Sequence, residues 1–374
     1  MRVSLVAVGA FAALALGAGC SGDGDSAPPP TASQSAPPAA AEARAENGAL
    51  LFTRPSGNAS SQRYELLMTD ERGGPARRFA QRLFPGRDVD VSPDGRTVAF
   101  TRPARTGPGG WRLSTPHDIF LTRVANDTTT RLERTRENEQ GPQFSADGRW
   151  LSVYYPTSIE SGRVGIVEIA NGGTRDVLAA PGDQYGHGWE PGTHRYLFSH
   201  GSFLNNRYDL YVTDADTAEA TRIPSTEEFR GGSAAWTPGG QIFIITRDES
   251  KRPDEDSVWA LGTDGATPRL VATTRGRTYE MVFAPDDGAI AAWLDFKEIG
   301  ERVVVAELGD EPVELAADMG VPGWSPMWSP DGTMVAFLRG RRVWLMDADG
   351  SNPRPVKGSR GTEHLVAWLA APAG

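Results

Sequence analysis

The chain reads Trp-Ser-Pro-Asp-Gly-Thr-Met-Val-Ala-Phe from Trp328 to Phe337, and this stretch is repeated along the sequence. Val91–Phe100 matches it at nearly every chemical position, and Phe144–Leu151 keeps all of it but the proline. Weaker copies start at Trp189, Trp236 and Phe283, and a last copy, Val366-Ala367-Trp368, has no continuation. The apolar anchors recur about every 46 residues, which is the period of a repeat architecture.

Each copy has the chemistry of a β-hairpin. In the Ser-Pro-Asp-Gly turn, proline fixes φ at the second position, aspartate tolerates the third, and glycine takes the positive φ that follows. The next strand is apolar at almost every position, which predicts cover on both faces. This holds in Thr97–Phe100, Ile242–Ile245, Ala289–Leu294 and Met334–Leu338. A third strand, an Asp-rich turn and a polar edge strand follow, so each unit is predicted to be a four-stranded antiparallel meander.

Four-stranded units at this period predict the blades of a β-propeller. The sequence resembles the TolB-type propellers, relatives of the WD-repeat family, whose blades carry a Trp-Ser-Pro-Asp-Gly turn that leads into an Ile/Val-Ala-Phe strand. The resemblance covers about residues 49 to 374 and concerns fold rather than chemistry. It implies an all-β domain. The best-known members of the family help to maintain the bacterial envelope by binding other proteins.

The two ends of the repeat region are predicted to complete one blade. Residues 49 to 80 supply three strands of a blade that lacks its first strand, and Glu363–Trp368 supplies a first strand that lacks the rest. Pairing these segments would protect the sheet edges at both termini. The expected fold is therefore a seven-bladed propeller closed by its N- and C-terminal strands, with six or eight blades as alternatives.

The N-terminal segment has the anatomy of an export signal. An apolar run from Val3 to Leu16, too short to span a bilayer, precedes Ala18-Gly19-Cys20. This segment resembles a bacterial lipoprotein signal, in which the cysteine becomes the lipidated first residue. We expect residues 1–19 to be removed and Cys20 to anchor the protein to the cell membrane or outer membrane of a bacterium, on the extracytoplasmic side. A secretory signal with an incidental cysteine is the alternative.

The segment after Cys20 is predicted to be a disordered tether. Residues 21–47 are rich in Pro, Ala and Ser and contain no aromatic residue, Leu, Ile or Val. Nothing in this composition can offset the entropy lost on ordering. The predicted organisation is a signal peptide over 1–19, a lipidated cysteine and tether over 20–47, and a propeller over 48–374.

The composition favours many short elements and argues against nucleic-acid binding. The 374 residues include 43 Gly and 28 Pro, which favours short elements joined by tight turns. The net charge of −10 and the pI of about 5.1 argue against binding to nucleic acid, which needs a Lys/Arg surface. Cys20 is the only cysteine, so the chain has no internal disulfide.

The sequence contains no recognised catalytic motif. It has no Gly-x-Ser-x-Gly, His-Glu-x-x-His, phosphate-binding Gly loop or Cys-x-x-Cys, so we expect no catalytic residue and no cofactor. His194 and His200 lie about 20 Å apart along one strand, at about 3.3 Å per residue, and cannot share a metal ion. The Asp-rich turns lack the ligand spacing of a calcium loop. We therefore expect no metal site.

Long, uneven loops after the second strands predict the binding surface, because insertions in repeat arrays gather on one face. The candidate contact residues in these loops are Arg105, Trp111, Arg112, Phe203, Asn206 and Arg252. First strands begin at the same face, where an acidic channel mouth is expected, with Asp90, Glu139, His187, Glu280 and His364. The alternative is that these loops are polar and solvated without binding anything.

These observations predict a membrane-anchored propeller lipoprotein that acts as a non-catalytic scaffold for an envelope protein or peptide. We expect it to be a monomer that binds no nucleic acid and touches the membrane only through its lipid. The alternative is a propeller enzyme, a polysaccharide lyase or hydrolase with its site in the central channel. In that case His187, His364 and Glu280 are the candidates for acid/base or metal chemistry.

Overall fold

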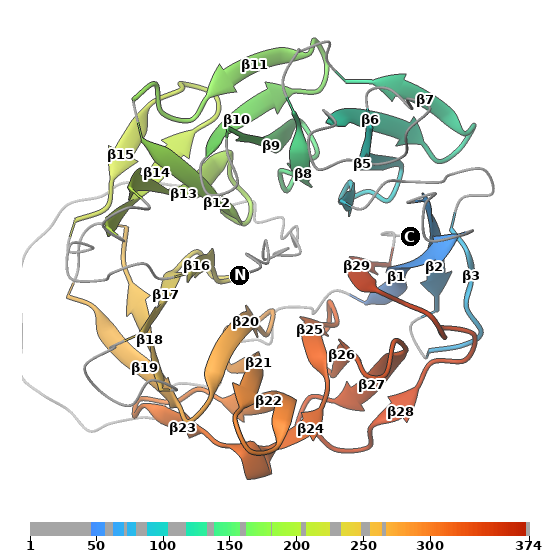
Figure 1. The fold of residues 1–374 in the computed structure, drawn as a ribbon, viewed down its shortest axis with the longest axis vertical. Coiled ribbons are helices and arrows are strands. Elements are labelled where there is room, and N and C mark those ends of the chain that lie inside the picture. Colours follow the sequence, from blue (N-terminus) through green and yellow to red (C-terminus); the bar gives the residue numbers. More distant parts are fainter. Residues whose placement is uncertain are drawn as a thin grey trace, which may run out of the picture.

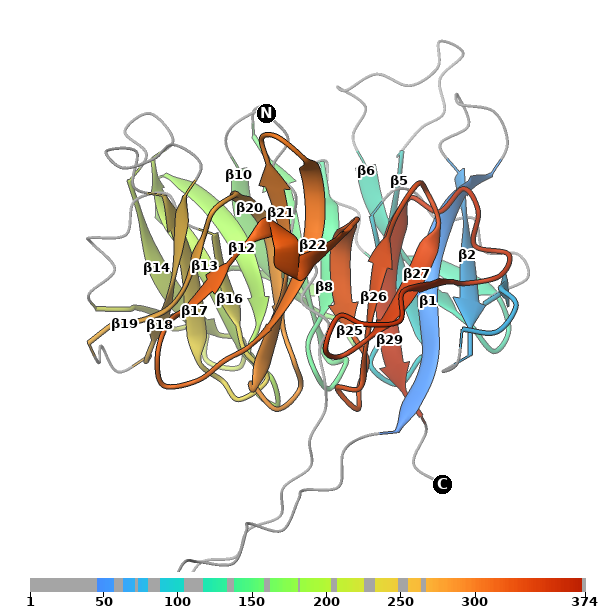
Figure 2. The same ribbon diagram turned by 90° about the horizontal axis from the view of Figure 1, so that it is seen from below.

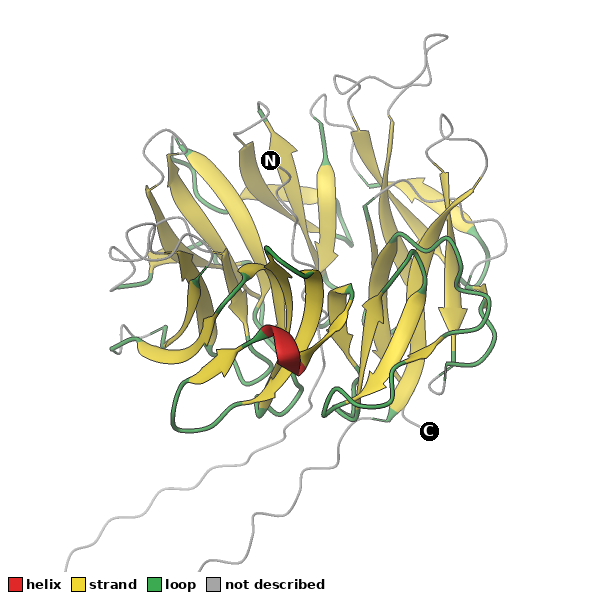
Figure 3. Ribbon diagram, turned by 60° about the horizontal axis from the view of Figure 1, so that its bottom comes forward, coloured by secondary structure: helices red, strands yellow, loops and turns green. Residues whose placement is uncertain are grey.

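The protein is a ring of β-sheets around one axis, as Figure 1 shows. The structure is a computed structural model that describes residues 46–56, 63–70, 73–79, 88–103, 117–132, 138–157, 162–180, 182–202, 207–224, 233–247, 255–263 and 267–371. Seven sheets surround the axis, and Figure 3 shows how strands dominate over the short 3-10 helix η2 (Ala317–Met319). None of the helices in these ranges has the length and apolarity to cross a membrane. The predicted seven-bladed propeller is confirmed.

Each sheet is one blade, and its first strand lies nearest the axis (Figure 1). Blade 1 contains both β1 and the last strand, and the others follow in chain order. The inner strands of blades 1 to 7 are β29 (His364–Ala370), β4 (Val89–Val91), β8 (Gln140–Phe144), β12 (Asp183–Trp189), β16 (Ser233–Trp236), β20 (Arg277–Phe283) and β25 (Trp324–Trp328).

The other strands follow outward from the axis in antiparallel order. The second strands are β1 (Asn47–Ser56), β5 (Thr97–Pro103), β9 (Trp150–Pro156), β13 (Arg195–Ser202), β17 (Ile242–Arg247), β21 (Ala289–Phe296) and β26 (Met334–Leu338). The third strands are β2 (Arg63–Thr69), β6 (His117–Arg123), β10 (Gly162–Glu168), β14 (Arg207–Asp214), β18 (Asp256–Leu261), β22 (Gly300–Glu307) and β27 (Val343–Asp347). The fourth strands are β3 (Arg77–Arg78), β7 (Thr128–Arg131), β11 (Gly173–Asp176), β15 (Ala220–Arg222), β19 (Arg269–Thr274), β24 (Gly320–Pro322) and β28 (Arg354–Pro355).

The Ser-Pro-Asp-Gly turns close through a repeated set of side-chain hydrogen bonds. In blade 7, Ser329 Oγ donates to Asp331 Oδ1 at 2.7 Å and accepts the N–H of Met334 at 3.0 Å. Asp331 Oδ1 also accepts the N–H of Thr333 at 2.9 Å. Gly332 has a φ of 71°, which residues with a Cβ rarely adopt. The same pairs, Ser92–Asp94 and Ser145–Asp147, close the turns of blades 2 and 3.

Blade 1 is built from both ends of the chain. The strand β29 pairs antiparallel with β1, with Leu50 opposite Trp368 and Leu51 opposite Ala367. Figure 2 shows the two strands side by side. Leu50, Leu51 and Trp368 are buried between blades. The predicted closure by the terminal strands is confirmed.

Blade 5 departs from the predicted four strands. The strand β23 (Val313–Leu315) lies in sequence between two strands of blade 6, yet it pairs in parallel with β19 of blade 5. Leu315 is fully buried in the core between these blades, and this burial accounts for the crossing. The crossing strand also covers an edge that would otherwise be open.

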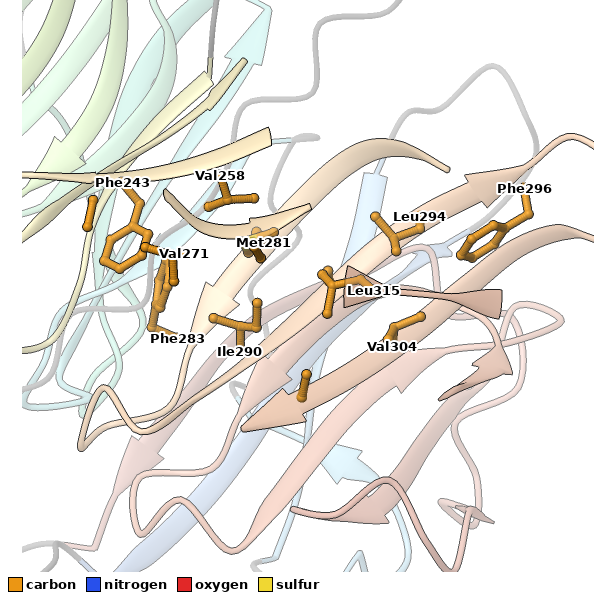
Figure 4. Close-up of a cluster of buried hydrophobic side chains, with 14 residues drawn as sticks. Phe243, Val258, Val271, Met281, Phe283, Ile290, Leu294, Phe296, Val304 and Leu315 are labelled. Atoms are coloured by element: carbon orange, nitrogen blue, oxygen red, sulfur yellow. The ribbon is translucent and has the colours of Figure 1, made fainter. Parts of the chain in front are cut away.

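Hydrophobic cores lie between neighbouring blades and make the ring rigid. Figure 4 shows the largest of them, between blades 5 and 6, where Phe243, Val258, Met281 and Leu294 are buried together. The ring centroids of Phe243 and Phe283 lie 4.2 Å apart. Close packing of this kind resists deformation. The ends of the strands therefore carry their side chains in fixed positions.

Candidate functional site

The predicted channel residues lie on or just before the inner strands of the ring. We call one end of the ring the upper face: inner strands begin there and second strands end there, whereas the Ser-Pro-Asp-Gly turns lie at the lower face (Figure 2). The five predicted channel residues are described. The anchor residue and the six loop residues lie outside the described residues: Cys20, Arg105, Trp111, Arg112, Phe203, Asn206 and Arg252.

Asp90 and Glu139 bind backbone N–H groups at blade junctions. Asp90 Oδ2 accepts the N–H of Phe144 in the next blade at 2.7 Å. Burial raises the pKa of Asp90 to about 6, against the lowering effect of its backbone hydrogen bonds. Glu139 is 2% exposed, and its Oε2 accepts the N–H of Ile119 at 3.0 Å. Both carboxylates therefore link neighbouring blades.

His187 lies at a β-bulge in the inner strand of blade 4. The register of β12 against β13 shifts between Gly186 and Gly188, which leaves His187 as the extra residue. Its Nε2 atom lies 3.0 Å from Ser199 Oγ. Burial lowers the pKa of His187 to about 4, so its imidazole is neutral at pH 7.

Glu280 and Ser325 form a polar pair between the inner strands of blades 6 and 7. Burial raises the pKa of Glu280 to about 7, and a hydrogen bond with Ser325 partly offsets this effect. Ser325 has a φ of 50°, and Gly141 has a φ of 57° at the equivalent position of blade 3. A serine here stores strain that glycine avoids, and such strain gathers at functional sites.

His364 lies at the start of the closing strand. Its ring centroid is 6.3 Å from that of Tyr64. The neighbouring Glu363 accepts hydrogen bonds from Arg341 at 2.6 Å and from the Tyr64 hydroxyl at 3.1 Å. This part of the upper face is therefore a small network of aromatic and charged groups.

The predicted channel residues do not assemble a metal site in the described part of the chain. No three His, Cys, Asp or Glu side chains there come together as metal ligands. A carboxyl with a pKa of about 7, Glu280, can donate or accept a proton at neutral pH. Among the predicted channel residues, Glu280 is therefore the best suited to acid–base chemistry at neutral pH.

The structure also brings together residues that the sequence analysis did not select. Tyr154 of blade 3 meets Tyr185 and Tyr208 of blade 4 near the upper face. The sequence analysis also missed Ser325. Its alignment with Gly141 could have marked it as unusual, since a proline follows each of the two residues. The tyrosines gave no signal, because only the stacking of two blades places them side by side.

Comparison with known proteins supports the propeller fold. No protein-family profile matches the chain. A curated relative, an uncharacterized protein from Agrobacterium fabrum, is 24% identical over 259 residues, which cover 66% of this chain and 82% of that protein.

Several solved β-propellers are similar in structure at low sequence identity. The propeller domain of the Trilobed protease from Pyrococcus furiosus has a TM-score of 0.58 at 13% identity, over 84% of this chain and 94% of that one. Oligogalacturonate lyase from Vibrio parahaemolyticus has a TM-score of 0.52 at 12% identity, over 84% and 90%. TolB from Acinetobacter baumannii has a TM-score of 0.48 at 12% identity, over 86% and 81%. The Pyrococcus domain has an open velcro topology, whereas here β29 closes blade 1; the shared feature is the fold.

Proposed function

We propose that the protein is a lipid-anchored, extracytoplasmic β-propeller of the bacterial envelope that binds a protein or peptide and catalyses no reaction. One observation carries this proposal: several ionisable groups on or next to the inner strands make contacts within the ring itself. Asp90 and Glu139 accept backbone N–H groups of adjoining blades, and His187 contacts Ser199. Side chains that are hydrogen-bonded in this way stabilise the ring as a scaffold for binding.

The orientation of the ring supports binding at the upper face. The strand β1 begins at the lower face, and β29 ends there (Figure 2). A tether from Cys20 to Asn47 would thus leave the ring from its lower side and direct the upper face away from the lipid. Ile299, in the turn between β21 and β22 at the upper face, is 49% exposed and offers an apolar contact.

The anchor is tested by replacing Cys20 with serine. The wild-type chain should incorporate a radiolabelled fatty acid and sediment with membranes, whereas Cys20→Ser should lose the label and appear in the soluble extracytoplasmic fraction. Because one acyl chain anchors weakly, several chains on one cysteine are needed for stable residence. Unchanged membrane association of the serine variant would refute the lipid anchor.

The binding surface is tested by photocrosslinking in intact cells. A photoreactive phenylalanine analogue at Ile299 samples the upper face, and the same group at Asp349 samples a turn between β27 and β28 at the lower face. We expect one discrete adduct from position 299 and none from position 349. Adducts from position 349 alone, or from neither position, would contradict the proposal.

Glu280 is the observation that favours a second candidate, a polysaccharide-cleaving enzyme. Its pKa of about 7 suits general acid or base catalysis. The purified protein would then release new reducing ends from envelope polysaccharides, and Glu280→Gln would abolish the release. Absence of release by the folded wild-type protein would dismiss this candidate.

A further inference from the structure

The junction between blades 7 and 1 is basic, although the whole chain carries a net charge of −10. The segment that joins β28 to β29 crosses this junction, and residues 350–362 contain three basic residues but no Asp or Glu. Figure 1 shows the segment running from β28 past β3 to β29. The Lys357 carbonyl accepts the N–H of Ala76 at 2.9 Å, and the Gly361 N–H donates to the Arg341 carbonyl at 2.7 Å. The segment therefore contacts both blades.

Buried hydroxyl groups hold this segment in place. Ser359 and Thr362 are fully buried. Ser359 Oγ accepts the N–H of Val343 at 3.1 Å and donates to the Val356 carbonyl at 2.8 Å. Thr362 Oγ1 donates to the Ser359 carbonyl at 2.6 Å. The basic residues of the segment are therefore carried by a fixed backbone, and a preformed surface loses less conformational entropy on binding.

Two carboxylates at the junction are already paired with arginine. Glu65 forms ion pairs with Arg78 and, at 2.7 Å, with Arg54. Glu363 forms an ion pair with Arg341 at 2.6 Å. Three arginines thus face two carboxylates, and these pairs together keep one excess positive charge.

Lys357 and Arg360 add two more positive charges. Both side chains are exposed, and neither forms an ion pair among the described residues. Like charges gathered in this way repel one another, and the binding of an anion would remove this repulsion. The excess charge therefore points to an anionic partner.

The backbone at Arg341 also points to a role for its side chain. Gly340 and Arg341 form the two-residue turn between β26 and β27, with φ values of 58° and 56°. Such turns favour Gly, Asn or Asp at both positions, so an arginine stores strain there. Strain of this kind gathers at functional sites.

We propose that Arg78, Arg341, Lys357 and Arg360, the basic junction, bind an acidic peptide segment of a protein partner. The side chains of Arg78 and Arg341 are 41% and 59% exposed, and guanidinium groups bind carboxylates through paired hydrogen bonds. The turn of Arg341 and the start of β29 lie at the upper face. Because the tether would leave from the lower face, this position favours a protein over an anionic membrane. The inference rests on the proposed function and names the chemistry of the partner.

The test is a titration of the purified full chain with dye-labelled hexaglutamate and, as a neutral probe, hexaglutamine. Fluorescence anisotropy should show binding of hexaglutamate alone, and its affinity should fall as the salt concentration rises. No binding of hexaglutamate by the folded protein, or equal binding of hexaglutamine, would overturn the proposal. Short-chain polyphosphate and phosphatidylglycerol vesicles are tested in parallel. Binding of either one without binding of hexaglutamate would assign the surface to another class of partner and would also overturn it.

A double variant connects the binding to the junction. Lys357→Gln with Arg360→Gln should weaken hexaglutamate binding by roughly twofold to thirtyfold, the range for two exposed ion pairs. The matched control is Arg123→Gln with Arg269→Gln, which removes the same charge from exposed positions of blades 2 and 5. The control should bind as the wild type does. Equal weakening by the two double variants, or none by the first, would refute the basic junction.

A footprint on the wild type decides the question if the double variant fails to fold. Bound hexaglutamate should slow the acetylation of Lys357, measured by mass spectrometry, and leave that of the exposed Lys297 in blade 6 unchanged. Equal rates at Lys357 with and without hexaglutamate would refute the site. The photocrosslink at Ile299 is a separate readout. An adduct there without hexaglutamate binding would reject the basic junction and keep the proposed function, whereas hexaglutamate binding without an adduct would do the reverse.

Discussion

Asn47 Oδ1 accepts the backbone N–H of Asp331 at 3.0 Å, across 284 residues of sequence. Asn47 is the first residue of β1, and Asp331 belongs to the Ser-Pro-Asp-Gly turn of blade 7. The start of the closing blade is thus fixed to the turn of the preceding blade. Ring closure therefore depends on this contact as well as on the pairing of β1 with β29.

The closing strand should be a major determinant of stability. Trp368 is 4% exposed and lies in the core between blades 7 and 1, so Trp368→Ala should lower the free energy of unfolding by about 3–5 kcal/mol. Asn47→Ala removes one hydrogen bond and should cost only about 0.5–1.5 kcal/mol. Denaturant unfolding of both variants tests this order. A Trp368→Ala protein as stable as Asn47→Ala would show that the ring does not need its C-terminal strand.

The aspartate of the repeated turn should stabilise each blade in which it occurs. Asp331→Ala removes the acceptor for Ser329 and Thr333 and should cost about 1–2 kcal/mol of unfolding free energy. Asp94→Ala is the matched variant in blade 2, where the same pair is present, and should cost a similar amount. A negligible effect at both positions would mean that the backbone turn forms without these side chains.

The same aspartate should make the fold sensitive to acid. Burial alone would raise the pKa of Asp331, but the hydrogen bonds from Ser329 and Thr333 hold it below its ordinary value. A lowered folded-state pKa gives stability that is present above about pH 4 and lost as the pH falls through the folded value. The cost of Asp331→Ala should accordingly shrink as the pH is lowered from 6 to 3 in denaturant unfolding. An equal cost at both pH values would contradict this linkage.

The fold was predictable because its signals repeat within single segments. The hairpin turns, the apolar second strands and the complementary terminal segments are all legible in the sequence, and the structure contains each of them. The crossing of β23 was not predictable, since Val313–Leu315 is a short segment that carries no sign of which blade it joins.

The candidate sites were less predictable because they depend on contacts between blades. Asp90 and Glu139 looked like free acidic residues of a channel mouth, yet their acceptors are engaged by backbone N–H groups. The tyrosine group joins side chains from two blades. Local sequence shows which strand a residue belongs to, and only the assembled ring shows which side chains face each other.

Glu280 should make the protein less stable as the pH rises through neutrality. Burial raises its pKa to about 7, so the folded state binds more protons than the unfolded state between about pH 4.5 and 7, and stability falls across this range. Glu280→Gln should therefore be more stable than the wild type at pH 8, by about 1–3 kcal/mol, and similar to it at pH 4.5. The exposed Glu307→Gln serves as a control without this effect. A destabilised Glu280→Gln protein at pH 8 would mean that the charged form is needed in the fold.

His194 should stabilise the lower face at low pH and lose this effect as the pH rises. Its Nδ1 and Nε2 atoms lie 2.6 Å from Asp216 Oδ2 and 2.8 Å from Asp147 Oδ2, which links blades 4 and 3. Burial alone would lower the pKa of His194, but the two carboxylates raise it above its ordinary value. Arg149 also contacts Asp216, at 3.1 Å, and shares this cluster.

A raised histidine pKa gives stability that is fully present below about pH 6.5 and lost as the pH rises through the folded-state value. The wild type should thus have a free energy of unfolding about 0.5–1 kcal/mol above that of His194→Gln at pH 5.5, and this difference should shrink by pH 8.5. Asp147 and Asp216 have lowered pKa values and stay charged over this range. Denaturant unfolding measures both proteins at each pH. Because Glu280 is present in both, its contribution cancels in the difference between them. A difference that grows with pH would show that the neutral imidazole, and not the cation, holds the two blades together.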